Sequence, residues 1–128
     1  LDEFVQKRRS VADTYREAFK DIKGLQMQEV PAGREHAYHL FPILVPEGID
    51  RDAFYDRMRN ENIGVNVHYI PIYEFTLYKD LGLDDADCPV TDGVFSRLIS
   101  LPMHPGLSQE EVQRVIDTTI KTIQELRA

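Results

Sequence analysis

Two segments with a helical spacing of apolar residues, one at each end of the chain, constrain the fold most strongly. Apolar side chains recur every three or four positions through residues 1–23, and Gly24 follows as the expected C-cap. The second segment begins at Ser108, which forms a capping-box pattern with Glu111, and continues to Ile123. Each segment predicts an amphipathic helix with one face to bury.

Three shorter segments between these helices have the composition of β-strands. Residues 36–45 are rich in aromatic and branched side chains, and residues 65–69 alternate apolar with polar side chains. A third short strand is expected over residues 98–101. Pro42 has no backbone N–H group, so it predicts that the first of these strands lies at a sheet edge or carries a bulge.

Further helices are expected between the strands. Asp50 is the expected N-cap of a helix that runs through Asn60. Residues 73–82 predict a short helix or an ordered loop, and another helix is expected over residues 90–97. The order α-β-α-β-α-β-α predicts a single α+β domain over residues 1–128. We expect about three mostly antiparallel strands, with helices packed on one side.

Composition limits the partners that the chain could bind. It has 15 basic and 22 acidic side chains and a net charge of -7. This balance argues against a nucleic acid as the main partner, because phosphate binding relies on clustered Lys and Arg. No apolar run approaches the roughly 20 residues of a membrane helix, so no membrane partner is expected. Cys88 is the single cysteine, which excludes an internal disulfide and favours a cytoplasmic location.

The residues alone reveal no catalytic machinery and no metal site. The four histidines lack the spacing of metal ligands, and His36 and His39 should point to opposite faces of one strand. Asp84, Asp85 and Asp87 fall in a predicted loop. That loop lacks the glycine and the distal glutamate of a calcium-binding EF-hand. No glycine-rich phosphate loop is present either.

A series of short motifs nevertheless runs through the chain. The motifs are Leu1-Asp2-Glu3-Phe4, Arg8-Arg9, Tyr15, His36-Ala37-Tyr38-His39-Leu40-Phe41, Arg51-Asp52, Asn62-Ile63-Gly64-Val65, Val67-His68-Tyr69-Ile70-Pro71-Ile72 and Leu101-Pro102-Met103-His104-Pro105-Gly106-Leu107-Ser108. In these motifs and in their order, the chain resembles the C-terminal, small domain of the DegT/StrS-type sugar aminotransferases. Those proteins are pyridoxal-phosphate enzymes with the aspartate aminotransferase fold.

The resemblance implies a longer parent enzyme, and the absence of a Met before Leu1 suggests the same. Such an enzyme moves an amino group from glutamate or glutamine to a nucleotide-linked keto-sugar. In that family the N-terminal large domain supplies the Schiff-base lysine and the acidic partner of the pyridine nitrogen. Pyridoxal 5'-phosphate is therefore expected on the full-length homodimer and not on this segment alone. None of the five lysines here matches the catalytic one.

The resemblance also implies substrate contacts. His39 matches a histidine that faces the active site near the amino-sugar. His68 and Tyr69 match a segment that lines the nucleotide-sugar entrance, often close to the subunit interface. Tyr73 stands where a histidine is common, and His36 completes the predicted set. Neutral imidazole and phenol groups can hydrogen-bond sugar hydroxyls or phosphate oxygens without burying a charge, although such residues can equally be satisfied within a core.

Two alternatives stay open at this level. One is the corresponding lobe of a pyridoxal-phosphate-dependent sugar dehydratase of the same fold, in which a histidine replaces the lysine. The other is a non-catalytic binding module that kept the fold. For His104 we expect a structural role.

Overall fold

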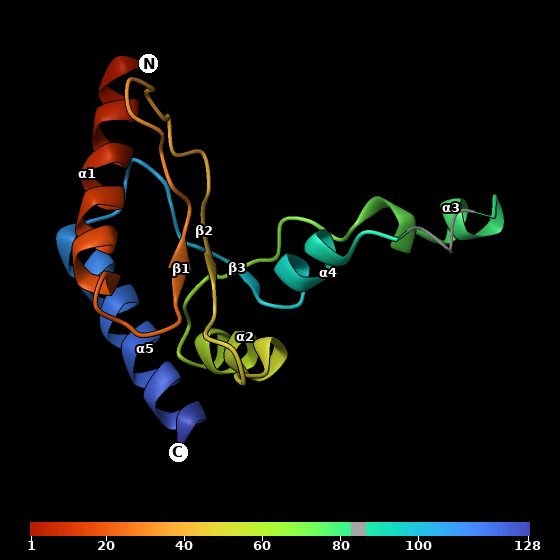
Figure 1. Cartoon of the computed structure of the whole chain (residues 1–128). Helices are drawn as coiled ribbons and strands as arrows, with labels where there is room; N and C mark the ends of the chain where they lie inside the picture. The colour runs from red at the N-terminus through yellow and green to blue at the C-terminus, as the bar shows by residue number, and fades with distance from the viewer. Residues whose placement is uncertain (83–86) are drawn as a thin grey trace.

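Three short strands form an antiparallel sheet in the order β1-β2-β3 (Figure 1). The computed structural model describes residues 1–82 and 87–128, so Asp84 and Asp85 of the predicted acidic loop lie outside the described residues. The prediction of an α+β domain with about three antiparallel strands is confirmed. The strands are β1 (Gln26–Met27), β2 (Phe41–Leu44) and β3 (Leu98–Leu101).

Helices α1 and α5 lie beside each other and cover one face of this sheet (Figure 1). Helix α2 packs against α5. This arrangement of α1 and α5 agrees with the prediction of helices packed on one side of the sheet. Ser108 and Glu111 form the predicted capping box at the start of α5. The helices of the described residues are α1 (Asp2–Phe19), α2 (Arg51–Asn60), the 3-10 helix η1 (Ile72–Glu74), α3 (Thr76–Asp80), α4 (Pro89–Phe95) and α5 (Gln109–Arg127).

Tyr15 connects the first helix to the sheet. Its ring is fully buried between Phe19, at a centroid distance of 5.8 Å, and Phe41 of β2, at 5.1 Å. Its hydroxyl donates a hydrogen bond of 3.0 Å to the carbonyl oxygen of Pro102, directly after β3. Burial raises the pKa of Tyr15, since the phenolate would be desolvated there. One side chain thus fixes α1 against two strands.

Pro42 lies in the central strand and in unbroken register with β3, so the prediction of a sheet edge or a bulge at this strand is wrong. Pro42 is opposite Ser100, whose backbone N–H and C=O both bond to Asn66 on the far side of β3. The backbone of Pro42 therefore faces away from β3, toward β1. Since β1 ends at Met27, opposite Ile43, no ladder bond requires the missing donor.

The expected strand over residues 65–69 is reduced to one bridge, between Asn66 and Ser100. In this register Gly64 would be opposite Pro102, which has no N–H group, so the ladder cannot extend in that direction. The third strand is instead β1, which the sequence analysis missed because two residues are too few to show a periodic pattern.

The first helix ends earlier than predicted. Lys20 is its C-cap, and the N–H of Ile22 bonds to the carbonyl of Phe19. Gly24 adopts a positive φ of 79°, but it does so in the turn into β1 rather than at the helix end. The prediction of Gly24 as the C-cap is therefore wrong.

A projecting arm, residues 69–82, extends away from the body of the domain together with α4 (Figure 1). It contains η1 and α3, which agrees with the prediction of a short helix or ordered loop. Neither helix contains a buried residue. Across the described residues, every helix is too short or too polar to cross a bilayer.

Replacing Tyr15 with Phe tests the role of its hydroxyl. The ring packing would be kept, but the carbonyl of Pro102 would lose its donor. We expect the free energy of unfolding to fall by about 1–2 kcal/mol in urea denaturation. Tyr55→Phe is the matched control, because Tyr55 is partly buried and its change should stay within about 0.5 kcal/mol. Equal losses in both variants would contradict the role given to the Tyr15 hydroxyl.

Candidate functional site

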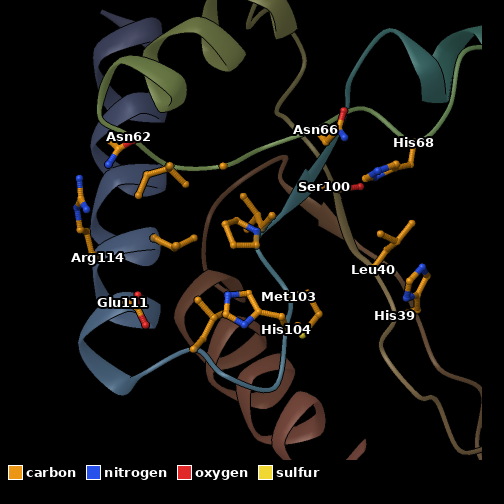
Figure 2. A pocket seen from close by; sticks show the side chains of 16 residues that line it. His39, Leu40, Asn62, Asn66, His68, Ser100, Met103, His104, Glu111 and Arg114 are labelled. Atoms are coloured by element: carbon orange, nitrogen blue, oxygen red, sulfur yellow. The ribbon is translucent and has the colours of Figure 1, made fainter. Parts of the chain in front are cut away.

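A hollow of about 480 Å³ opens beside the end of β3. Its walls come from three places: residues 39–40 before β2, the segment 62–68 after α2, and the loop from β3 into the first turns of α5 (Figure 2). His39, His68, Asn66 and Ser100 lie at one end, and Asn62, Glu111 and Arg114 lie at the other.

The end of α2 directs the chain into this hollow. Asn62 has a positive φ of 58°, and its N–H bonds to the carbonyl of Arg59. The N–H of Ile63 bonds to the carbonyl of Met58, and both of these side chains are buried. This is a Schellman arrangement, in which Asn is tolerated at the left-handed position. The prediction that this helix runs through Asn60 is confirmed.

The next contact fixes the segment to the sheet. The N–H of Ser100 bonds to the carbonyl of Asn66 at 2.7 Å, and the N–H of Asn66 bonds to the carbonyl of Ser100 at 3.2 Å. The Asn66 side chain accepts a further bond from the N–H of Val67 at 2.8 Å. These bonds place His68, two residues later, over the edge of β3.

Three polar side chains toward the α5 end of the hollow, Glu111, Arg114 and His104, already have partners. Glu111 accepts bonds from the backbone N–H and the hydroxyl of Ser108, which lower the pKa of the Glu111 carboxyl. Arg114 donates to the carbonyl of Glu61. His104 accepts a bond from the N–H of Gly106 at Nδ1, which supports the expected structural role. The side-chain hydrogen bonds at this end of the hollow therefore stabilise the fold.

The opposite end has unused hydrogen-bonding capacity. His39 is exposed and has no side-chain partner in the described part of the chain. His68 is half-buried, and its Nδ1 atom is buried without a partner. The hydroxyl of Ser100 is buried and unpartnered as well. Neutral groups of this kind can bind hydroxyl, carbonyl or phosphate oxygens.

Three of the predicted site residues, Tyr69, His36 and Tyr73, lie outside the hollow. Tyr69 follows His68 through a cis peptide bond and is 70% exposed, with its ring 4.7 Å from the His68 ring. His36 is half-buried in its own loop. Its Nδ1 accepts from the N–H of Tyr38, and its Nε2 lies 3.3 Å from the side-chain amide of Gln28. The structure thus brings His39 and His68 together, but not Tyr69 or His36.

Tyr73 lies on the projecting arm. Its hydroxyl donates a hydrogen bond to the carboxylate of Asp92 in α4, at 2.5 Å. This bond to Asp92 is the main reason that the pKa of Tyr73 is raised to about 12. The side chain therefore joins η1 to α4 and does not enter the hollow.

Ser100 and Asn66 are the residues of this site that the sequence analysis missed. Ser100 lies in the predicted strand over residues 98–101, but a serine in a short apolar run predicts only a strand position. Asn66 was predicted merely as the polar member of an alternating strand. Their importance comes from a pairing between distant segments, which no local spacing predicts.

Comparison with known proteins assigns the chain to a protein family. The model of the DegT/DnrJ/EryC1/StrS aminotransferase family matches residues 1–120. The chain belongs to this family. The resemblance inferred from the motifs is thereby confirmed.

Relatives within the DegT/DnrJ/EryC1/StrS family align along most of the chain. The spore coat polysaccharide biosynthesis protein SpsC of Bacillus subtilis is 34% identical over 91% of the chain and 31% of its own length. The dTDP-3-amino-3,4,6-trideoxy-alpha-D-glucose transaminase of Micromonospora megalomicea is 31% identical over 96% of the chain and 33% of its own length. The chain spans about a third of the length of these curated relatives.

Solved structures of aminotransferases share the fold. The aminotransferase TlmJ from Streptoalloteichus hindustanus superimposes with a TM-score of 0.90 and 25% identity, covering 100% of this chain and 34% of its own. The sugar aminotransferase Spr1654 from Streptococcus pneumoniae in its PMP form gives 0.88 and 28% identity, covering 97% and 32%.

The described residues do not fit covalent binding of the cofactor implied by the family. A Schiff-base lysine needs a desolvated or electrostatically perturbed amine. None of the residues that line the hollow is a lysine. Four of the five lysines pair with surface carboxylates, and Lys23 is exposed. No group of three or more metal-ligating side chains occurs within residues 1–82 and 87–128.

The raised pKa of Tyr73 allows a test of the hydrogen bond that joins the arm to α4. Its bond to Asp92 should be intact below the ordinary phenol pKa of about 10 and be lost as the pH rises through about 12. Asp92→Asn removes the negative charge, so the pKa of Tyr73 should fall toward about 10. Phenolate absorbance during a pH titration measures it.

The matched control for this titration is Asp80→Asn, which changes an exposed carboxylate in α3. It should leave the Tyr73 titration unchanged. An identical effect of both substitutions would show that overall charge, and not the Tyr73–Asp92 bond, sets this pKa.

Proposed function

We propose that this chain is the C-terminal lobe of a pyridoxal-phosphate-dependent aminotransferase that acts on a nucleotide-linked keto-sugar, with glutamate or glutamine as the amino donor. The observation that carries the proposal is the family match along nearly the whole chain, combined with a hollow whose unpartnered groups are neutral and polar. Relatives named as nucleotide-sugar transaminases favour transamination over the dehydratase alternative.

In this proposal the lobe binds and orients the substrate. His39 and His68 would hydrogen-bond oxygens of the nucleotide sugar from one end of the hollow. Tyr69, Tyr73 and His36 lie farther out and would contact the substrate at the entrance. The cofactor, which serves as the electron sink of the reaction, would be held by the remainder of the parent protein.

A homodimeric, cytoplasmic parent is part of the same proposal. The projecting arm carries large apolar side chains in contact with water, which is costly unless another protein surface covers them. A partner subunit or the large domain would provide that surface. The side chains are Tyr69, Ile70, Ile72, Phe75, Leu77 and Leu81, which are 47–70% exposed.

Substrate binding is tested by His39→Ala and His68→Ala in the full-length protein. Each variant should raise KM for the nucleotide sugar about five- to tenfold, because one hydrogen bond worth ~1 kcal/mol is lost. KM for the amino donor should change much less. His104→Asn is the control, since its side-chain oxygen can still accept from Gly106. Unchanged sugar KM in both alanine variants would remove these histidines from the site.

Cofactor binding provides a separate test. After borohydride reduction in the presence of pyridoxal phosphate, the 128-residue chain alone should carry no specifically attached cofactor, because its lysines are solvated and ion-paired. The full-length protein should retain one per subunit. Specific labelling of a single lysine in the chain, detected by peptide mass spectrometry, would overturn the assignment of the cofactor to the rest of the parent.

A further inference from the structure

Ser100 combines deep burial with an unused hydroxyl. Only 3% of its surface is exposed, and its Oγ has no hydrogen-bond partner. Leaving a buried hydroxyl unpaired destabilises the folded state, so an unpartnered hydroxyl next to a candidate site calls for an explanation. His68 lines the same hollow. Figure 2 shows the Ser100 hydroxyl directed toward the ring of His68, whose Nδ1 is also buried and unpartnered.

The two groups are held on a common frame. Both backbone hydrogen bonds of Ser100 go to Asn66, which precedes His68 by two residues. The Ser100 side chain can therefore rotate, but its backbone cannot shift relative to this segment without breaking both bonds. In the structure the two side chains stop short of hydrogen-bond geometry. The proposed bond therefore requires a change of the Ser100 rotamer or of the His68 ring orientation.

The number of available donors and acceptors indicates which of the two groups, the Ser100 hydroxyl or His68 Nδ1, donates the hydrogen bond. If Nδ1 carried the proton and donated to Ser100, the serine hydroxyl would still need an acceptor, and the described residues supply none. If Ser100 donates to Nδ1, both atoms are satisfied at once. The ring proton then resides on Nε2. That nitrogen is not among the buried unpartnered atoms and keeps access to solvent.

We propose that Ser100 is a positioning residue that fixes His68 in its Nε2–H tautomer and aims this donor at an oxygen of the nucleotide-sugar substrate. The inference rests on the proposed function for the identity of the ligand. It adds Ser100 to the site and gives His68 one role, that of a neutral donor to a hydroxyl, carbonyl or phosphate oxygen.

Nitrogen NMR of the full-length protein with isotope-labelled histidine tests this directly. The His68 signals, assigned by their loss in His68→Gln, should report an unprotonated Nδ1 and a protonated Nε2. In Ser100→Ala the ring should become a mixture of tautomers, and affinity for the nucleotide sugar should fall about fivefold. Ser100→Thr, which keeps the hydroxyl, should restore the tautomer.

Thr119→Val is the matched control. Thr119 also has a buried, unpartnered hydroxyl, but it lies in α5 and does not line the hollow. This variant should leave both the His68 signals and the affinity unchanged. A protonated Nδ1 in the unmodified protein, or identical His68 signals in Ser100→Ala, would overturn the inference while leaving transamination intact. The expected tautomer shift without any aminotransferase activity would instead support Ser100 and defeat the proposed function.

Discussion

The paired hydrogen bonds between Asn66 and Ser100 are the contact on which the candidate site depends. They join a segment that leaves α2 to the strand that leads into α5, and they do so at a single position. They are the backbone hydrogen bonds that join the segment before His68 to β3. The burial of Tyr15 supports this arrangement from the other side, because its hydroxyl binds Pro102 just after that strand. The positions of the site residues therefore depend on contacts with the core of the domain.

The hollow divides into a structural half and a half that has unused binding capacity. Near α5 the capping box and the arginine bond to the chain itself, which ties the start of the helix to the end of α2. Near β2 and β3, imidazole and hydroxyl groups face the hollow without partners. This contrast, more than the number of polar residues, indicates where a hydroxyl-rich substrate would bind. It also explains why His39 and His68 are better candidates than His36, whose ring nitrogens are engaged within its own loop.

Local patterns predicted the helices well and the sheet less well. Asp50, Ser108 and the apolar face of α5 act within one or two turns, so their signals are readable from spacing alone. The sheet depends on register between distant segments. Pro42 could be central only because β1 stops at Met27, and the single bridge formed by residues 65–69 cannot extend toward Gly64 because Pro102 lies opposite. Ser100 escaped notice for the same reason, since its partner is 34 positions away in the chain (100 − 66).

The most direct test of the account is a crystal structure of the full-length protein with a nucleotide sugar bound. The account predicts that oxygens of the sugar or its phosphates lie within hydrogen-bond distance of His39 and of Nε2 of His68, with the Ser100 hydroxyl bonded to Nδ1. It also predicts that the cofactor is attached to a lysine outside this chain. A substrate bound elsewhere, with the hollow filled by side chains of the large domain, would contradict it.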